Sequence, residues 1–253
     1  MLKKRVIPCL LLRGAGLVKT VRFKDPKYVG DPINAIRIFN DKEVDELVLL
    51  DITATREGRG PSFSVIEEVA SECFMPLAYG GGIRTVEEAR RILKLGVEKI
   101  VLNTIAWRDV AVLTAASEEF GAQAIVASID VRRGMLGKYE VVVESAAKRT
   151  GVDPVTYARR LEAAGAGEIL LTSVDRDGTM QGYDVDLIAR VSAAVQVPVI
   201  ASGGAGSLHD FRIATHEGGA AAVAAGAMFV FHGPHRAVLI TYPGRTELEA
   251  ALP

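Results

Sequence analysis

The sequence predicts an α/β fold, a (βα)₈ TIM barrel built from two similar half-barrels. The segment 76–84 (PLAYGGGIR) reappears 122 positions later as 198–206 (PVIASGGAG), and the same spacing superposes 45–49 (DELVL) on 167–171 (GEILL). Each copy reads as strand, turn and helix, and a two-fold repeat of such units over 253 residues is typical of one barrel. We expect a single domain over residues 1–253, with half-barrels at about 1–120 and 121–253.

Eight short apolar runs predict the buried parallel strands of this barrel. They lie near 5–11, 46–51, 76–79, 98–102, 124–129, 168–172, 198–202 and 221–225. Helix starts follow several of them. Asp31 and Asp153 each precede a proline and are expected N-caps, Thr85 to Glu88 reads as a capping box, and Ser207 to Asp210 resembles that box. These caps put the carboxyl ends of the strands on one face, where barrel enzymes keep their active sites.

The longest loops are expected on that same face. They follow strand 1 (13–30), strand 2 (53–60) and strand 5 (131–151), and loops of this length usually have a function. A polar loop, 175–179, follows strand 6.

Composition narrows the class of protein. Hydrophobic residues make up 49% and charged residues 24%, enough to bury a sizeable core, and a net charge of −1 excludes long-range attraction to nucleic acid or to an anionic membrane. Cys9 and Cys73 are too few for a disulfide scaffold and are expected as small buried hydrophobes. The basic start, Met1 to Arg5, precedes an apolar run too short for a signal or transmembrane segment. We expect a soluble cytoplasmic protein with no nucleic-acid or membrane partner.

Two glycine turns, one in each half, predict anion binding. The turns 80–83 and 202–206 both lead from a strand into a helix, and bare backbone there can approach a phosphate. Glycines also serve simply to allow tight turns, but the repeat favours two phosphate sites and a ligand with a phosphate at each end. Asn103, whose other reading is a turn cap, and Thr104 supplement the first site, and their repeat equivalents are Ala225 and Gly226. The predicted phosphate-binding residues are Gly81, Gly82, Asn103, Thr104, Asp177, Gly178, Ser202, Gly203, Gly204 and Gly226.

Candidate catalytic residues lie at strand ends. Asp130 closes the first strand of the second half, whereas its counterpart in the first half is Leu11. Asp51 and Asp175 occupy similar positions, and a carboxylate there can act as a general acid or base, although a lone Asp is more often a cap or an ion-pair partner. Lys19, in the loop after strand 1, is expected to bind a substrate anion or to close over it.

Other kinds of site are not indicated. The four histidines have no metal-ligand spacing, and no Ser-His-Asp arrangement, Walker motif or Rossmann fingerprint is present. We therefore expect no metal and no cofactor.

Several motifs in order resemble the cyclase subunit of imidazole glycerol phosphate synthase. They are 4–9 (KRVIPC), 45–53 (DELVLLDIT), 80–84 (GGGIR), 128–130 (SID), 167–178 (GEILLTSVDRDG) and 200–206 (IASGGAG). The resemblance implies a barrel of the ribulose-phosphate-binding type in the histidine pathway. It also implies a glutaminase subunit as heterodimeric partner. Ammonia from that partner would enter at the amino-terminal face, travel through the barrel and meet a ribulosyl bisphosphate-type substrate at the carboxy-terminal face.

The resemblance assigns roles to particular residues. The family's gate for ammonia maps to Arg5, Glu46, Lys99 and Glu168, and its glutaminase-docking face includes Glu98 and Gln123. Its two catalytic aspartates map to positions 11 and 130, and a leucine at 11 cannot transfer a proton or stabilise a developing positive charge. Ordinary cyclisation and lyase chemistry is therefore not expected.

Two segments, 13–17 and 231–243, depart from the histidine enzyme and resemble a divergent branch associated with surface-polysaccharide genes and the amidation of a sugar. Three functions follow. The first is an ammonia-accepting subunit of a glutamine-dependent amidotransferase that acts on a phosphorylated small molecule or sugar. The second is a true cyclase in which Asp51 or Asp175 replaces the missing acid. The third is a non-catalytic scaffold that docks and activates a glutaminase.

Overall fold

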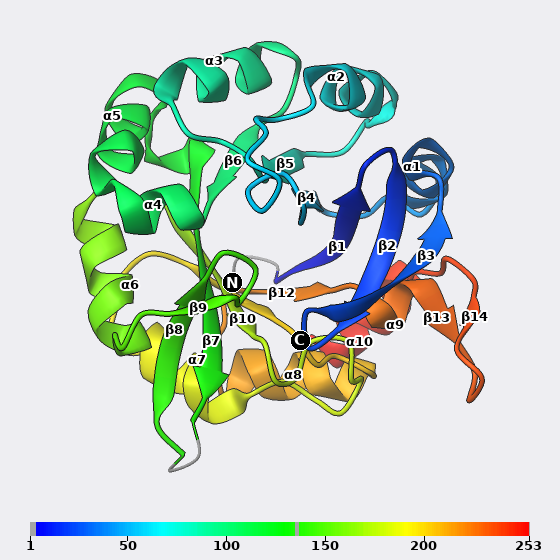
Figure 1. The fold of residues 1–253 in the computed structure, drawn as a ribbon. Coiled ribbons are helices and arrows are strands. Elements are labelled where there is room, and N and C mark those ends of the chain that lie inside the picture. The colour runs from blue at the N-terminus through cyan, green and yellow to red at the C-terminus, as the bar shows by residue number, and fades with distance from the viewer. Residues whose placement is uncertain (1–3, 135–136, 253) are drawn as a thin grey trace.

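Eight parallel strands close into a barrel in the computed structural model, which describes residues 4–134 and 137–252. The strands form an inner ring and the helices lie around it (Figure 1). Arg5 to Pro8 of the first strand pair with Ala222 to Ala225 of the last, which closes the ring and confirms the predicted barrel. In ring order the strands are β1 (Arg5–Arg13), β4 (Leu47–Asp51), β5 (Leu77–Gly80), β6 (Lys99–Leu102), β7 (Ile125–Arg133), β10 (Glu168–Ser173), β11 (Val199–Ser202) and β12 (Ala222–Ala225).

The helices begin where the capping residues predict. Asp31 accepts a hydrogen bond from the Asn34 amide, and Asp153 accepts from the amides of Val155 and Thr156. The helices are α1 (Pro32–Asp41), α2 (Phe63–Glu72), α3 (Val86–Lys94), α4 (Thr104–Arg108), α5 (Val110–Phe120), α6 (Pro154–Ala163), α7 (Val185–Ser192), α8 (Leu208–His216), α9 (Ala227–Val230) and α10 (Arg245–Ala251), with a 3₁₀ turn, η1 (Ala122–Ala124).

One of the two capping boxes differs from expectation. Ser207 and Asp210 form the complete reciprocal box. The Thr85 side chain accepts from the Glu88 amide, as predicted. The Glu88 carboxylate, however, accepts from the amide of Arg84 and not from that of Thr85, so this box is not reciprocal.

Two of the predicted loops are wrong, because they form antiparallel strands. The segment after β1 folds into β2 (Gly16–Val21) and β3 (Lys24–Gly30), and the segment after β7 contains β8 (Tyr139–Val143) and β9 (Lys148–Arg149). Both β1 and β7 are nine residues long, so their ends reach beyond the barrel and offer free backbone to a hairpin. The C-terminal segment adds a further pair, β13 (Phe231–His232) and β14 (Ala237–Val238).

The core has two layers. One lies between the strands and the helices, and the second fills the barrel itself. The interior set consists of Ile7, Cys9, Leu11, Val18, Val48, Ala78, Val101, Val126, Leu170, Ile200, Ala222 and Ala224. Cys9 is buried there as expected, whereas Cys73 is only half-buried because it lies in the connection that follows α2.

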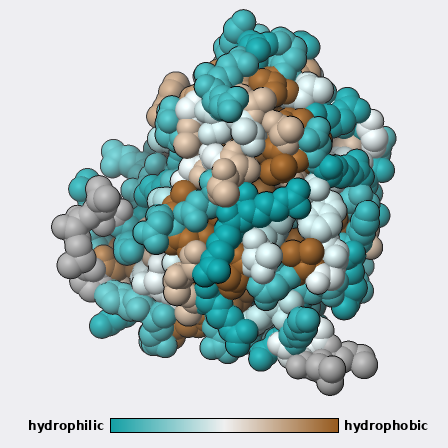
Figure 2. Space-filling view, turned by 90° about the vertical axis from the view of Figure 1, so that its left-hand side faces the viewer, coloured by the Kyte–Doolittle hydropathy of each residue, from teal (hydrophilic) through white to brown (hydrophobic). Residues whose placement is uncertain are grey.

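The outer surface is mostly hydrophilic where α5 and α6 cover the barrel, with hydrophobic side chains scattered in small groups (Figure 2). Among the helices of residues 4–134 and 137–252, none is long and apolar enough to cross a membrane.

Candidate functional site

A cavity of about 580 Å³ opens at the carboxyl ends of the barrel strands. The two glycine turns, the ends of β1 and β7 and the β2–β3 hairpin border it. The structure thus brings the predicted catalytic and phosphate-binding positions together in one place. They are Leu11, Lys19, Gly81, Gly82, Asn103, Thr104, Asp130, Asp177, Gly178, Ser202, Gly203, Gly204 and Gly226.

The two glycine turns have similar backbone geometry. Gly81 and Gly203 have φ values of 117° and 89°. A Cβ added to Gly81 would lie 2.3 Å from the Asp51 carbonyl oxygen, and a Cβ added to Gly203 would lie 2.6 Å from the Ser173 carbonyl oxygen. Asp51 and Ser173 are themselves 122 positions apart. Because both the conformation and the close approach require glycine, the two halves build one kind of turn, with backbone exposed to the cavity in each.

Asp130 is buried at the end of β7. Its Oδ2 accepts a hydrogen bond from Asn103 Nδ2 at 2.9 Å, and the same amide donates to Ser128 Oγ at 3.3 Å. Burial raises the pKa of Asp130 to about 7, with the Asp177 charge raising it further and the Asn103 bond opposing the rise. A carboxyl group that titrates near neutrality can both give and take a proton at physiological pH. Asn103 therefore orients this acid, and its side chain does not cap α4.

Lys19 is not a loop residue, since it lies in β2 and is 6% exposed. Its Nζ is 3.1 Å from Asp177 Oδ1, and Thr20 Oγ1 donates to Asp177 Oδ2 at 3.0 Å. The pairing brings an ammonium group to the cavity wall and occupies both oxygens of Asp177. A sequence that separates Lys19 and Asp177 by 158 positions gives no signal for this contact.

Leu11 occupies the place that corresponds to Asp130. Leu11 pairs with Leu50 across β1 and β4, while Asp130 pairs with Thr172 across β7 and β10, and positions 50 and 172 are repeat equivalents. Leu11 is 8% exposed and belongs to the apolar set that fills the barrel. The first half therefore lines the cavity with leucine where the second half presents a carboxyl and a hydroxyl group.

The two alternative acids are held by other groups. Asp51 lines the cavity, but its carboxylate forms an ion pair with Arg59 Nη1 at 2.9 Å. It also accepts hydrogen bonds from the amides of Thr53 and Ala54. Asp175 Oδ2 accepts from the Arg133 amide at 2.7 Å, and Asp175 is outside the cavity lining. Arg59 was missed from sequence, because nothing in its pattern distinguishes it from a solvated surface arginine.

The Cys9 thiol also lines the cavity, and burial raises its pKa to about 11. It is therefore uncharged at neutral pH and adds apolar surface.

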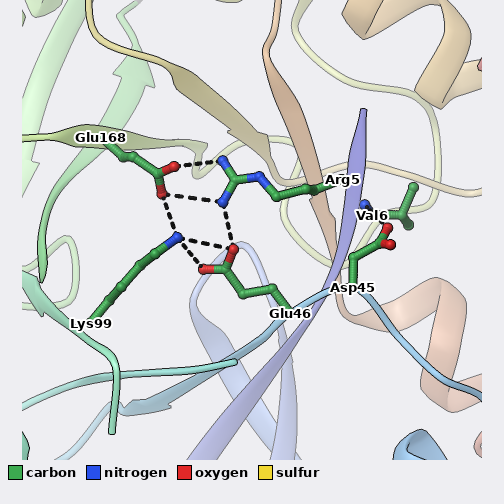
Figure 3. A network of polar contacts seen from close by, with 6 residues as sticks. All are labelled: Arg5, Val6, Asp45, Glu46, Lys99 and Glu168. Carbon is green, nitrogen blue, oxygen red and sulfur yellow. Dashed lines mark hydrogen bonds and ion pairs between the residues drawn. The ribbon is translucent and has the colours of Figure 1, made fainter. Parts of the chain in front are cut away.

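At the opposite end of the barrel, four charged side chains form a closed ring (Figure 3). Arg5 contacts Glu46 at 2.5 Å and Glu168 at 2.6 Å, and Lys99 contacts the same two acids at 3.0 and 3.1 Å. All four residues lie at or next to the amino-terminal ends of β1, β4, β6 and β10. Glu46 is 2% exposed as a residue, so the ring is costly to desolvate and is not explained by stability alone.

The predicted docking residues lie at the same end. Glu98 and Gln123 are both exposed, one just before β6 and the other in η1 before β7. Among residues 4–134 and 137–252, no three His, Cys, Asp or Glu side chains are grouped so that they could share a metal ion.

Known proteins provide an independent comparison. The family model described as "Histidine biosynthesis protein" matches residues 5–233. A protein of Pseudomonas aeruginosa, provisionally named imidazole glycerol phosphate synthase subunit hisF2, is 53% identical over 98% of this chain and 99% of its own length. The provisionally named subunit hisF3 of Vibrio vulnificus is 47% identical over 100% and 97%, and the imidazole glycerol phosphate synthase subunit HisF of Alkaliphilus metalliredigens is 48% identical over 92% of each chain.

Proposed function

The chain belongs to the histidine biosynthesis protein family, among relatives of the HisF type, and we propose that it is the ammonia-accepting synthase subunit of a glutamine-dependent amidotransferase. The observation that carries this proposal is the contrast between the two ends of the barrel. The charged ring is complete at one end, whereas at the other end Leu11 leaves incomplete the catalytic pair that the family resemblance implies. The ring of Arg5, Glu46, Lys99 and Glu168 supports passage of ammonia from a glutaminase subunit that forms a heterodimer with this chain.

Ammonia would enter through the ring and follow the apolar interior of the barrel. That interior includes small side chains such as Ala78, Ala222 and Ala224, and it ends at the cavity that Leu11 and Asp130 border. An apolar path favours uncharged ammonia over ammonium, because desolvating an ion is costly.

The acceptor in this proposal is a phosphorylated sugar. The paired glycine turns support a ligand with anionic groups toward both halves, and Lys19, paired with Asp177, brings an ammonium group to the cavity wall. Since Leu11 replaces the second acid, the reaction would be an amidation and not an ordinary cyclisation. We propose surface-polysaccharide synthesis as its setting.

Asp130 has one role in this reaction, proton transfer. When ammonia adds to a carbonyl carbon of the acceptor, the C=O π bond breaks, its electrons move to the oxygen, and the new nitrogen loses a proton to the Asp130 carboxylate. When the tetrahedral adduct collapses, the bond to the departing oxygen breaks and Asp130 returns the proton to that oxygen. Its raised pKa keeps this base close to neutrality, while Asn103 fixes the carboxylate orientation.

The proposal can be tested with the purified chain, the glutaminase subunits of its source genome and a panel of phosphorylated sugars. We expect glutamine-dependent transfer of nitrogen to one of them, detected by mass spectrometry. In a Glu46→Gln variant, glutamine-dependent turnover should fall relative to turnover with added ammonium. If the histidine-pathway substrate were instead converted at ordinary rates, the proposal would be wrong.

A second candidate is the cyclase subunit of imidazole glycerol phosphate synthase. The 48% identity to the Alkaliphilus HisF subunit favours it, with Asp51 or Asp175 replacing the acid missing at position 11. Both acids have fixed partners, which argues against their release for catalysis. Growth of a cyclase-deficient histidine auxotroph that carries this chain would favour the cyclase.

A non-catalytic scaffold is the third candidate. It predicts that Asp130→Asn leaves product formation intact, whereas both enzymatic candidates predict its loss.

A further inference from the structure

Phe74 is the most exposed of the large hydrophobic side chains in the described part of the chain. It lies in the connection between α2 and β5 and is 85% exposed. Single exposed hydrophobic residues are common on protein surfaces, so exposure alone says little. The backbone around this ring and its position at the amino-terminal end of the barrel say more.

The backbone at Phe74 is held from α1. The Phe74 amide donates to Asn40 Oδ1 at 3.1 Å, and Asn40 Nδ2 donates to the Glu72 carbonyl at 2.7 Å. One side chain therefore fixes the chain on both sides of Cys73. A ring on such a fixed backbone loses little conformational entropy when a partner covers it, which is the property of an interface anchor.

The internal repeat shows that the fold does not need an aromatic residue here. The equivalents of Asn40 and Phe74, 122 positions later, are Glu162 and Gln196. The Gln196 amide donates to Glu162 Oε1 at 2.6 Å and the Val197 amide donates to the same oxygen at 3.0 Å, so the side chain at the equivalent position again clamps the backbone. There the clamp holds an exposed glutamine, so the exposed phenylalanine of the first half is not explained by folding.

The segment that follows Phe74 pairs with residues next to the charged ring. Two residues beyond it, the Pro76 carbonyl accepts from the Leu47 amide at 2.8 Å, directly after ring residue Glu46. The Leu77 carbonyl accepts from the Glu98 amide at 2.9 Å, directly before ring residue Lys99. The segment that carries the Phe74 side chain thus joins the starts of β4 and β6, on the face where ammonia would enter.

We propose that Phe74 is the apolar anchor of the interface with the glutaminase subunit and that its ring inserts into an apolar pocket of that partner. This inference rests on the proposed function. Ammonia escapes to water unless its source covers the face around the charged ring. A glutaminase is such a source, whereas a second copy of this chain is not. The anchor belongs to the first half-barrel, so the partner is expected to bind off-centre, toward β4, β5 and β6.

The test measures the affinity of the full-length chain for each purified glutaminase subunit of the source genome by titration calorimetry. Phe74→Gln installs the residue that the repeat tolerates at the equivalent clamp, so folding should be preserved. We expect this variant to raise Kd by about tenfold or more, and Phe74→Leu, which stays apolar, to raise it by less than about fivefold. The matched control, Gln196→Ala, should change Kd by less than about twofold.

The outcomes distinguish a wrong anchor residue from a wrong proposed function. If no glutaminase binds the wild-type chain, both the proposed function and this inference are wrong. If a glutaminase binds and Phe74→Gln binds equally well, with an unchanged thermal unfolding midpoint, only the anchor is wrong. A loss of affinity in Gln196→Ala equal to that in Phe74→Gln would also overturn the anchor, because the effect would then not be specific to the ring.

Discussion

The two half-barrels share their construction and differ in their chemistry. Helix caps at Asp31 and Asp153, and glycine turns at Gly81 and Gly203, recur at the same spacing with the same local geometry. At the mouth, however, Leu11 in one half stands against Asp130 in the other. The caps and turns that lead into the helices are thus retained in both copies, whereas the side chains at the predicted catalytic position of the mouth have diverged.

The base of the barrel shows the same division. The two acids of the charged ring, Glu46 and Glu168, are repeat equivalents, but the positions equivalent to Lys99 and Phe74 hold Ala221 and Gln196. A substitution in a repeated feature should therefore have similar effects in both halves, and one in a diverged position should not.

The largest difference between the halves is expected in catalysis. Asp130→Asn removes the proton-transfer group but keeps an oxygen that can accept the Asn103 bond, so turnover with added ammonium should fall about 10²–10⁴-fold. Leu11→Ala, at the equivalent position, should change turnover by less than about tenfold. Initial rates on the acceptor identified by the sugar screen would measure both, and equal losses would break the proposed division of roles.

The glycine turns should respond alike. Gly81→Ala and Gly203→Ala each force a positive φ on an L residue and a Cβ into a carbonyl oxygen, so each should lower the free energy of unfolding by about 2–5 kcal/mol. Gly14→Ala is the control, because its φ is 61° but nothing lies within 4 Å, and about 1 kcal/mol is expected. Urea denaturation measures all three, and tolerance of alanine in one turn only would contradict their equivalence.

Of the two equivalent positions 11 and 130, only Asp130 should make the free energy of unfolding depend on pH. Because the pKa of Asp130 is raised to about 7 in the folded protein, the folded state binds more protons than the unfolded state between about pH 4 and pH 7. The free energy of unfolding of the wild-type protein should therefore fall as pH rises through that window. Asp130→Asn should therefore be more stable than wild type at pH 8, by on the order of 1–4 kcal/mol, with the difference vanishing near pH 4.

Urea titrations at pH 4, 6 and 8 would test this sign. Leu11→Asn is the control, since it introduces no titrating group and its effect should be the same at each pH. A stability gap between Asp130→Asn and wild type that narrows toward high pH would be inconsistent with a raised pKa.

The helix caps should give the smallest effects. Asp31→Ala and Asp153→Ala are each expected to cost about 1 kcal/mol of unfolding free energy. Asp153 should cost slightly more, because it accepts two backbone amides and Asp31 accepts one. Thermal unfolding of both variants would show whether the halves are matched at this level too.

Repeated, local features were predictable from the sequence, and long-range pairings were not. The eight strands and the caps at Asp31, Asp153 and Ser207 follow from local patterns, and the structure confirms them. The β2–β3 hairpin was missed because polar residues and glycines there read as a loop. The Lys19–Asp177 pair joins elements far apart in sequence, and the ring around Glu46 was anticipated only through the family resemblance.

The most direct test concerns the consequence of having Leu11 where the family resemblance implies a catalytic aspartate. The purified chain should be assayed with ammonium and the histidine-pathway substrate beside the Alkaliphilus HisF subunit. We expect this chain to cyclise the substrate at least about 10²-fold more slowly, because one of the two acids is absent. Comparable turnover by the two proteins would contradict it.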